Sequence, residues 1–139
     1  MDVDKLLNAL DNENNSRLIN MDTTQIENMK RDILKELELN DENYNDYLKK
    51  LKEYIYVDEL NDLKEGGFIR WIQLNNDDIY LTQGGIFCET LITDEGIKLV
   101  CKNFARRHFE IMMEDCLIFQ KLSGQELVLL SALDYLSEK

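Results

Sequence analysis

The sequence predicts an α+β fold in which N-terminal helices and a C-terminal apolar helix flank a central strand-rich segment. Before residue 66 and after residue 122, apolar residues recur every three or four positions, which is typical of amphipathic helices. Between these limits they alternate in short runs that polar turns separate, which is typical of strands. We expect the central segment to form a small five-stranded antiparallel barrel or a curved sheet, because several short strands joined this tightly must bend.

The chain of 139 residues is long enough for one core with a helical extension. We expect residues 1–65 to hold a short helix, an Asn-rich connection and two further helices. Residues 66–122 would then form the barrel. Residues 123–139 would form the last helix, packed on the barrel or at an oligomer interface.

Two polar signals predict where the N-terminal helices begin. Thr24 and Glu27 have the spacing of a capping box, and Asn40 can cap the helix that follows it. After Asn40 a tyrosine-rich stripe at helical spacing continues to Ile55, which predicts the longest helix of the chain, running on toward Gly66. Such a stripe is more often core than a binding face.

Glycines and polar turns divide the central segment into strands. The pair Gly84 and Gly85 lies inside a strand pattern, which predicts a bulge or a sharp bend. Residues 93–96 read Thr-Asp-Glu-Gly and predict a tight β-hairpin. The expected strands are residues 68–74, 79–92, 97–101, 109–113 and 116–122.

The C-terminal segment opens with a capping-box pattern, Ser123 to Glu126, and continues with apolar residues around most of its circumference. A helix this apolar must be buried against the rest of the chain or against a second copy. The residues we expect at an oligomer interface are Leu127, Leu130, Leu133 and Leu136.

The formal net charge of −12 opposes binding to nucleic acid, but the charge is uneven. Residues 96–108 hold four bases and no acid, whereas residues 1–66 hold 17 acids and nine bases. Basic side chains beside aromatic ones can hold single-stranded nucleic acid. They can equally pair with acidic helices of this chain or with an acidic partner, and we favour this second interpretation. The candidate binding residues are Lys98, Lys102, Phe104, Arg106, Arg107 and His108.

Few residues could support catalysis or bind a metal. The chain has three cysteines, far apart in sequence, and one histidine, with no phosphate-binding glycine loop and no Gly-x-Ser-x-Gly pattern. The acidic pairs at residues 77–78 and 94–95 lack the alternating spacing of a calcium loop. We therefore expect free, mostly buried thiols, no enzyme activity, no cofactor and no metal.

Localisation is predicted from two negative observations. No apolar run reaches the length of a membrane span, and the first residues are acidic where a signal peptide is basic. We expect an intracellular, cytoplasmic protein that does not enter a membrane.

Three stretches, LKEGGFIRWI, LTQGGIFCE and MEDCLIFQKLSGQE, resemble uncharacterised small proteins of giant nucleocytoplasmic DNA viruses, from about residue 60 to the end. This resemblance implies a location in the infected-cell cytoplasm or the virion. The strand pattern is also similar in outline to Tudor-like and Src-homology-like barrels. No clear aromatic cage accompanies it, because Trp71, Tyr80 and Phe87 fit a core as well as a ligand site.

A well-patterned fold without a catalytic constellation favours a non-enzymatic protein–protein interaction or adaptor module. We expect a protein partner, with self-association as an alternative. A nucleic-acid-associated protein that uses residues 98–108 is the second hypothesis. A virion or scaffold component that assembles through the last helix is the third.

Overall fold

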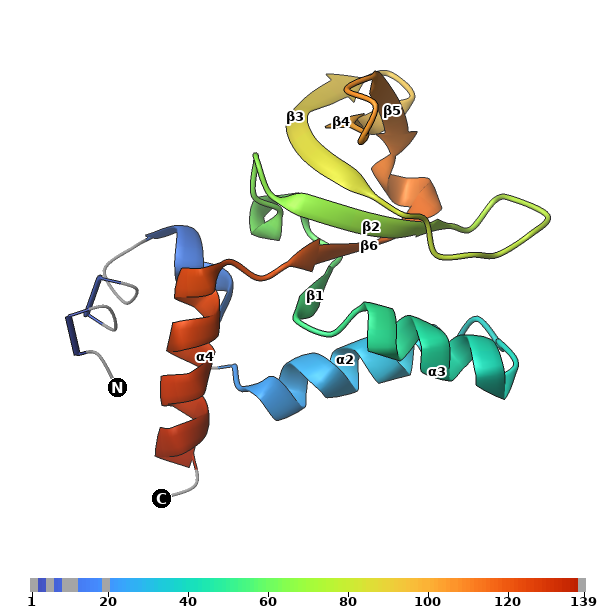
Figure 1. Cartoon of the computed structure of the whole chain (residues 1–139). Coiled ribbons are helices and arrows are strands. Elements are labelled where there is room, and N and C mark those ends of the chain that lie inside the picture. Colours follow the sequence, from blue (N-terminus) through green and yellow to red (C-terminus); the bar gives the residue numbers. More distant parts are fainter. Residues whose placement is uncertain (1–2, 5–6, 9–12, 19–20, 138–139) are drawn as a thin grey trace. The chain divides into compact units, whose positions relative to one another are not determined.

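The computed structural model describes residues 3–4, 7–8, 13–18 and 21–137. Its architecture is α+β, with the helices α2 (Thr23–Lys35), α3 (Asp41–Lys50) and α4 (Gly124–Ser137) and one six-stranded antiparallel sheet (Figure 1). The chain divides into two compact units. We call Met1–Ile55 together with Leu122–Lys139 the helical unit, and Tyr56–Lys121 the sheet unit.

The first expected helix falls partly on the described residues. Val3, Asp4, Leu7 and Asn8 have helical backbone, and the other positions of that helix lie outside the described residues. A short 3-10 helix, η1 (Glu13–Leu18), follows within the expected Asn-rich connection.

Helix α2 begins slightly before the predicted position. Asp22 is its N-cap: the Gln25 N–H donates to Asp22 Oδ1 (2.8 Å), and the Asp22 N–H donates to Gln25 Oε1 (3.1 Å). The predicted capping box at Thr24 and Glu27 is therefore wrong, because an equivalent acid–amide pair two residues earlier serves the same backbone groups. Asn40 caps α3 as predicted, accepting from the Asn43 N–H (2.7 Å).

Helix α3 ends at Lys50, so the prediction of a helix reaching Ile55 and beyond is wrong. Glu53 has a left-handed backbone (φ 66°), and the next residues form strand β1 (Tyr54–Val57). Aromatic and β-branched residues fill this strand, and such residues favour a pleated surface when they can pair. Directly before β1, the Glu53 carbonyl oxygen accepts a hydrogen bond from the Leu122 N–H (2.8 Å).

Helix α4 starts with the predicted capping box. The Glu126 N–H donates to Ser123 Oγ (3.1 Å), and the Ser123 N–H donates to Glu126 Oε1 (3.0 Å). The buried Glu126 carboxylate also accepts from Arg17 of η1, through Nε (2.8 Å) and Nη2 (2.9 Å). At the other end of α4, Asp134 accepts from the backbone N–H and the hydroxyl of Thr23. Both contacts join segments of the helical unit that are far apart in sequence.

The strand order in the sheet is β1-β6-β2-β3-β4-β5. Strands β1 and β5 are its two edges, so the sheet is not closed and the expected barrel is not confirmed. The structure has one strand more than the five that the sequence predicts. The additional strand is β1, whose residues the sequence pattern assigns to a helix. The remaining strands are β2 (Phe68–Gln73), β3 (Gly85–Thr93), β4 (Gly96–Lys102), β5 (His108–Met112) and β6 (Cys116–Lys121).

The predicted bend at the glycine pair is present. Ile72 faces Leu81 and Ile69 faces Gly85, so one more residue lies on the β3 side of this stretch than on the β2 side. Gly84 lies on this longer side and has a left-handed backbone, with φ +90°. A second irregularity, at Cys88, interrupts the pairing of β3 with β4. Bulges of this kind increase bending, and Figure 1 shows β3 as a strongly curved strand.

The hairpin predicted at residues 93–96 is confirmed, with Thr93 opposite Gly96. The last two strands also lie where the alternation placed them, separated by the 3-10 helix η3 (Met113–Asp115). A further 3-10 helix, η2 (Leu60–Asp62), precedes β2. The fully buried apolar residues of the sheet unit include Ile69, Ile72, Phe87, Leu99, Ile118 and Phe119.

Gly84 should tolerate no side chain. Its backbone is left-handed, and a Cβ there would collide with the Ile69 carbonyl oxygen; Gly66 has a similar φ of +83° but open space around it. We expect Gly66→Ala to lower the free energy of unfolding by about 1 kcal/mol and Gly84→Ala by roughly 3 kcal/mol or more. Urea denaturation followed by fluorescence of Trp71, the single tryptophan, measures both. If both substitutions lower the free energy of unfolding equally, the bend does not depend on the close contact between Gly84 and the Ile69 carbonyl oxygen.

Candidate functional site

Residues 103–107 join β4 to β5 in a loop that Asn103 closes. Asn103 Oδ1 accepts hydrogen bonds from the backbone N–H groups of Ala105 (2.9 Å) and Arg107 (3.1 Å). The Asn103 N–H donates to the Arg107 carbonyl oxygen (3.1 Å), and the Arg106 N–H donates to that of Asn103 (2.9 Å). Asparagine commonly organises turns through such local bonds. The loop backbone is therefore defined, and the side chains of residues 104–107 are exposed on it.

The six predicted binding residues lie on β4, this loop and the first position of β5. Lys102 and His108 face each other across the β4–β5 pair, one on each side of the loop. The loop thus brings together the predicted residues from Lys102 to His108, whereas Lys98 lies farther along β4, opposite Met112. Exposed positions are Phe104, Arg106, Arg107 and His108, and half-buried positions are Lys98 and Lys102.

The cations of this segment differ in their partners. Lys98 Nζ lies 3.9 Å from a Glu95 carboxylate oxygen and 3.8 Å from one of Glu110. For Lys102, Arg106 and Arg107, no carboxylate of the described chain lies within ion-pair distance. These three cations remain available for an anionic partner, whereas Lys98 is already balanced.

Aromatic side chains adjoin the cations. Phe104 is 75% exposed, and its ring packs against that of Phe68 with centroids 5.6 Å apart. Trp71 and Phe109 form a second tilted pair at 5.3 Å. Such geometries suit aromatic rings, whose edges and faces carry opposite partial charges. A pocket of about 420 Å³ is lined by Trp71, Phe104 and Phe109 together with residues 82–84.

We call the combination of Phe68, Lys102, Phe104, Arg106 and Arg107 with this pocket the Phe104 surface. Exposed aromatic faces can stack on a planar group or cover an apolar side chain. The guanidinium groups can hold a carboxylate or a phosphate through paired hydrogen bonds. The Phe104 surface can therefore bind an anionic ligand that also presents apolar or aromatic groups.

The aromatic residues considered for a cage lie in different environments. Phe87 is 1% exposed and belongs to the core, whereas Tyr80 is 53% exposed in the segment before the bend. Trp71 is largely buried, yet its ring lines the pocket beside Phe109. Phe68 was not among the predicted binding residues. It is far from Phe104 in sequence, and only the folded structure shows that the two rings are in contact.

The residues predicted for an oligomer interface divide along α4. Leu130 is buried in the helical unit, and Leu127 and Leu133 are half-buried. Leu136 is 64% exposed, and its neighbour Tyr135 is exposed as well. The first part of the helix therefore contributes to the core of its own unit, and self-association through α4 stays a prediction.

The sheet unit contains the three cysteines, all with free thiols. Burial raises the pKa of Cys101 to about 12, with smaller contributions from Cys88 and Cys116. Burial, with the Asp115 carboxylate, raises the pKa of Cys116 to about 11. Thiols with these pKa values stay protonated at neutral pH and are poor nucleophiles. Across the described residues, no group of three or more His, Cys, Asp or Glu side chains is arranged to hold a metal ion.

The raised thiol pKa values predict an alkaline limit to stability. Because the folded pKa values exceed the unfolded value of 9.0, the thiols contribute stability that is complete below pH 9 and lost as pH rises toward 11 and 12. We expect the free energy of unfolding to fall less steeply above pH 9 in Cys101→Ala/Cys116→Ala than in the unsubstituted chain. Urea denaturation across this pH range measures the two slopes. If both proteins lose stability with the same slope, the two thiols are not the cause, because all other titrating side chains are the same in both proteins.

Comparison with protein-family models, with curated proteins and with solved structures finds no match to this chain. The resemblances to proteins of giant viruses and to Tudor-like or Src-homology-like barrels stay predictions. None of the described helices is long and apolar enough to cross a membrane.

Proposed function

We propose that this chain is a non-enzymatic protein-interaction module that binds its partner through the Phe104 surface. The observation that carries the proposal is the exposure of Phe104 between cations that no carboxylate of the described chain neutralises. Aromatic and arginine side chains are enriched among the residues that dominate binding energy at protein interfaces. A large aromatic ring on a defined loop loses little conformational freedom when a partner covers it.

The edge strand β5 gives this surface a second means of binding. It begins at His108, directly after the loop, and among the described strands it pairs only with β4. An edge strand presents backbone N–H and C=O groups to which an extended segment can add as a further strand. A partner segment with carboxylates near Arg106 and Arg107 and an apolar side chain on Phe104 would match both features.

A protein partner explains the surface better than a nucleic acid does. The net charge of −12 repels a phosphate backbone over an extended path, whereas a short peptide needs only a few local cations. The tilted ring pairs Phe68–Phe104 and Trp71–Phe109 nevertheless supply aromatic faces on which bases could stack. This specific observation keeps single-stranded nucleic acid as the second candidate.

Removing the main side chains of the Phe104 surface should strongly weaken partner capture. We expect the immobilised chain to retain a protein from its native lysate, and Phe104→Ala/Arg106→Ala/Arg107→Ala to retain it roughly tenfold less well or worse. The matched control is Ile92→Ala/Lys35→Ala/Lys50→Ala, which removes another exposed apolar residue and two other exposed cations. Quantitative mass spectrometry of the eluates gives the ratio. Equal loss in both variants, or no retained protein, would contradict the proposal.

The nucleic-acid candidate has its own signature. If a single-stranded oligonucleotide binds, replacing Lys102, Arg106 and Arg107 by alanine should reduce the slope of log affinity against log salt by about 0.7 for each phosphate that is no longer neutralised. Lys98→Ala is the internal control, since Lys98 is already balanced by Glu95 and Glu110. Fluorescence anisotropy at several salt concentrations measures the slopes. The absence of binding at low salt excludes this candidate and leaves the protein-partner proposal unaffected.

A further inference from the structure

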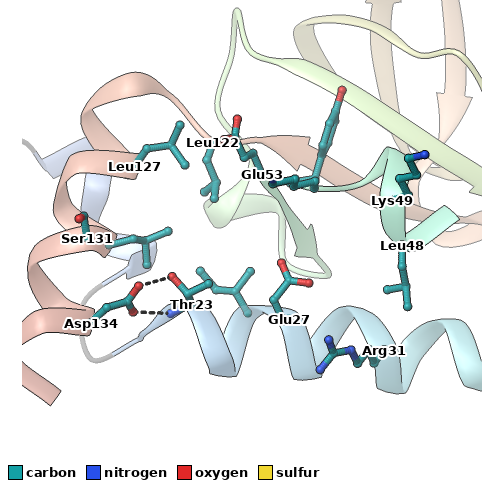
Figure 2. Close-up of a pocket in the computed structure, with 14 residues that line it drawn as sticks. Thr23, Glu27, Arg31, Leu48, Lys49, Glu53, Leu122, Leu127, Ser131 and Asp134 are labelled. Atoms are coloured by element: carbon teal, nitrogen blue, oxygen red, sulfur yellow. Dashed lines mark hydrogen bonds between the residues drawn. The ribbon is translucent and has the colours of Figure 1, made fainter. Parts of the chain in front are cut away.

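A second pocket, of about 620 Å³, lies entirely within the helical unit, among α2, α3 with the residues that follow it, and α4. Its apolar lining comes from Ile26, Leu48, Leu122, Leu127 and Leu130. Figure 2 shows Leu122 and Leu127 on one side of this pocket and Leu48 on the other. The volume lies in the range of roughly 300 to 1,000 Å³ that is usual for small-molecule sites.

Two of the acidic residues that line the pocket are engaged by neighbouring groups. Asp134 accepts hydrogen bonds from the Thr23 N–H (2.9 Å) and the Thr23 hydroxyl (2.6 Å), drawn as dashed lines in Figure 2. Glu27 pairs with Lys30, whose Nζ is 2.7 Å from the carboxylate and is fully buried. The same ammonium donates to the Leu51 carbonyl oxygen (2.8 Å). The charge of Glu27 is therefore balanced by Lys30, whereas Asp134 keeps its charge and is held in place by the Thr23 donors.

The cations of the lining have no such partners. Arg31, Lys49 and Lys52 are exposed, and no carboxylate in the described part of the chain lies within ion-pair distance of them. The remaining carboxylate of the lining is that of Glu53. Arg31, Lys49 and Lys52 therefore outnumber the carboxylates of Glu53 and Asp134, which gives the rim a small positive excess. The helical unit as a whole has 16 acidic and nine basic residues. An apolar cavity with a positive rim is complementary to a molecule with an apolar body and a negative head.

We propose that this pocket binds a single-chain amphiphile with an anionic head group, of which a fatty-acid carboxylate is the simplest example. The chain would contact Ile26 and the leucines, where it removes apolar surface from water. The carboxylate would lie at the rim near Arg31, Lys49 and Lys52. A cationic amphiphile would meet repulsion at the same place, so the rim selects the sign of the head group.

Titration of the full chain with dodecanoate, below its micelle concentration, tests the proposal by calorimetry. We expect saturable one-to-one binding of dodecanoate and roughly tenfold weaker binding of dodecyltrimethylammonium. Arg31→Gln/Lys49→Gln/Lys52→Gln should weaken dodecanoate about tenfold and leave its methyl ester within about twofold. The matched control, Lys35→Gln/Lys50→Gln/Lys121→Gln, removes the same charge from exposed positions outside the pocket. It should leave dodecanoate binding within about twofold.

Filling the cavity gives a second, independent readout. Leu127→Trp should abolish binding of both dodecanoate and its methyl ester while circular dichroism shows the helices intact. If Leu127→Trp unfolds the unit, Leu48→Trp on the opposite side serves the same purpose, because Leu48 is only half-buried. The proposal is overturned if dodecanoate does not saturate, if head-group charge makes no difference, or if both triple variants lose affinity equally. Binding of an acidic amphipathic peptide in place of dodecanoate would also overturn it, in favour of a protein occupant.

Discussion

The close approach of Gly84 to β2 is the constraint on which the sheet unit and the Phe104 surface depend. A bend here requires a residue with a left-handed backbone and no Cβ, since a side chain would strike the Ile69 carbonyl oxygen. A Cβ on Gly84 would also come within 3.0 Å of the Phe68 ring, and a Cβ on the next residue, Gly85, would come within 2.7 Å of the Lys102 carbonyl oxygen of β4. The glycine pair therefore lets the chain bend close to the backbones of β2 and β4, and it leaves room for the Phe68 ring that packs on Phe104.

The buried cations of the helical unit are held by carboxylates of the same unit. In the described interior, Arg17 and Lys30 are paired with Glu126 and Glu27, and each cation has a second hydrogen bond that satisfies it further. Removing one partner of such a pair is costly because an uncompensated charge stays buried. The Glu126 carboxylate serves the N-terminus of α4 as well, so the start of this helix and the position of η1 depend on the same group.

Features with local causes were predictable from the sequence, and features that depend on distant pairing were not. The hairpin at residues 93–96 and the cap of α4 follow from adjacent residues, and both are confirmed. Strand β1 was missed because Tyr54 and Ile55 also continue a helical stripe, and only its place in the sheet beside β6 decides between the two. A period of three or four cannot reveal a pairing partner more than sixty residues away.

The candidate sites show the same division. The cations at residues 98–108 were visible as a break in the charge pattern, and their loop could be located from its polar residues. Phe68 could not be assigned to this surface, since the fold rather than the spacing brings it to Phe104. The pocket of the helical unit was invisible for the same reason, because its lining comes from α2, α3 and α4, whose packing no local pattern specifies.

An acidic protein can bind an anion only where its own charge is locally reversed. At physiological ionic strength the screening length is about 8 Å, so a ligand responds to the few nearest charges more than to the net charge of −12. Exposed single cations contribute little by themselves, because water and salt weaken them. An adjoining apolar surface changes this, since it supplies most of the binding energy and excludes water from the cations. Phe104 with its arginines and the leucine-lined pocket with Arg31, Lys49 and Lys52 both combine exposed cations with an adjoining apolar surface, and for this reason we propose them as sites for anionic partners.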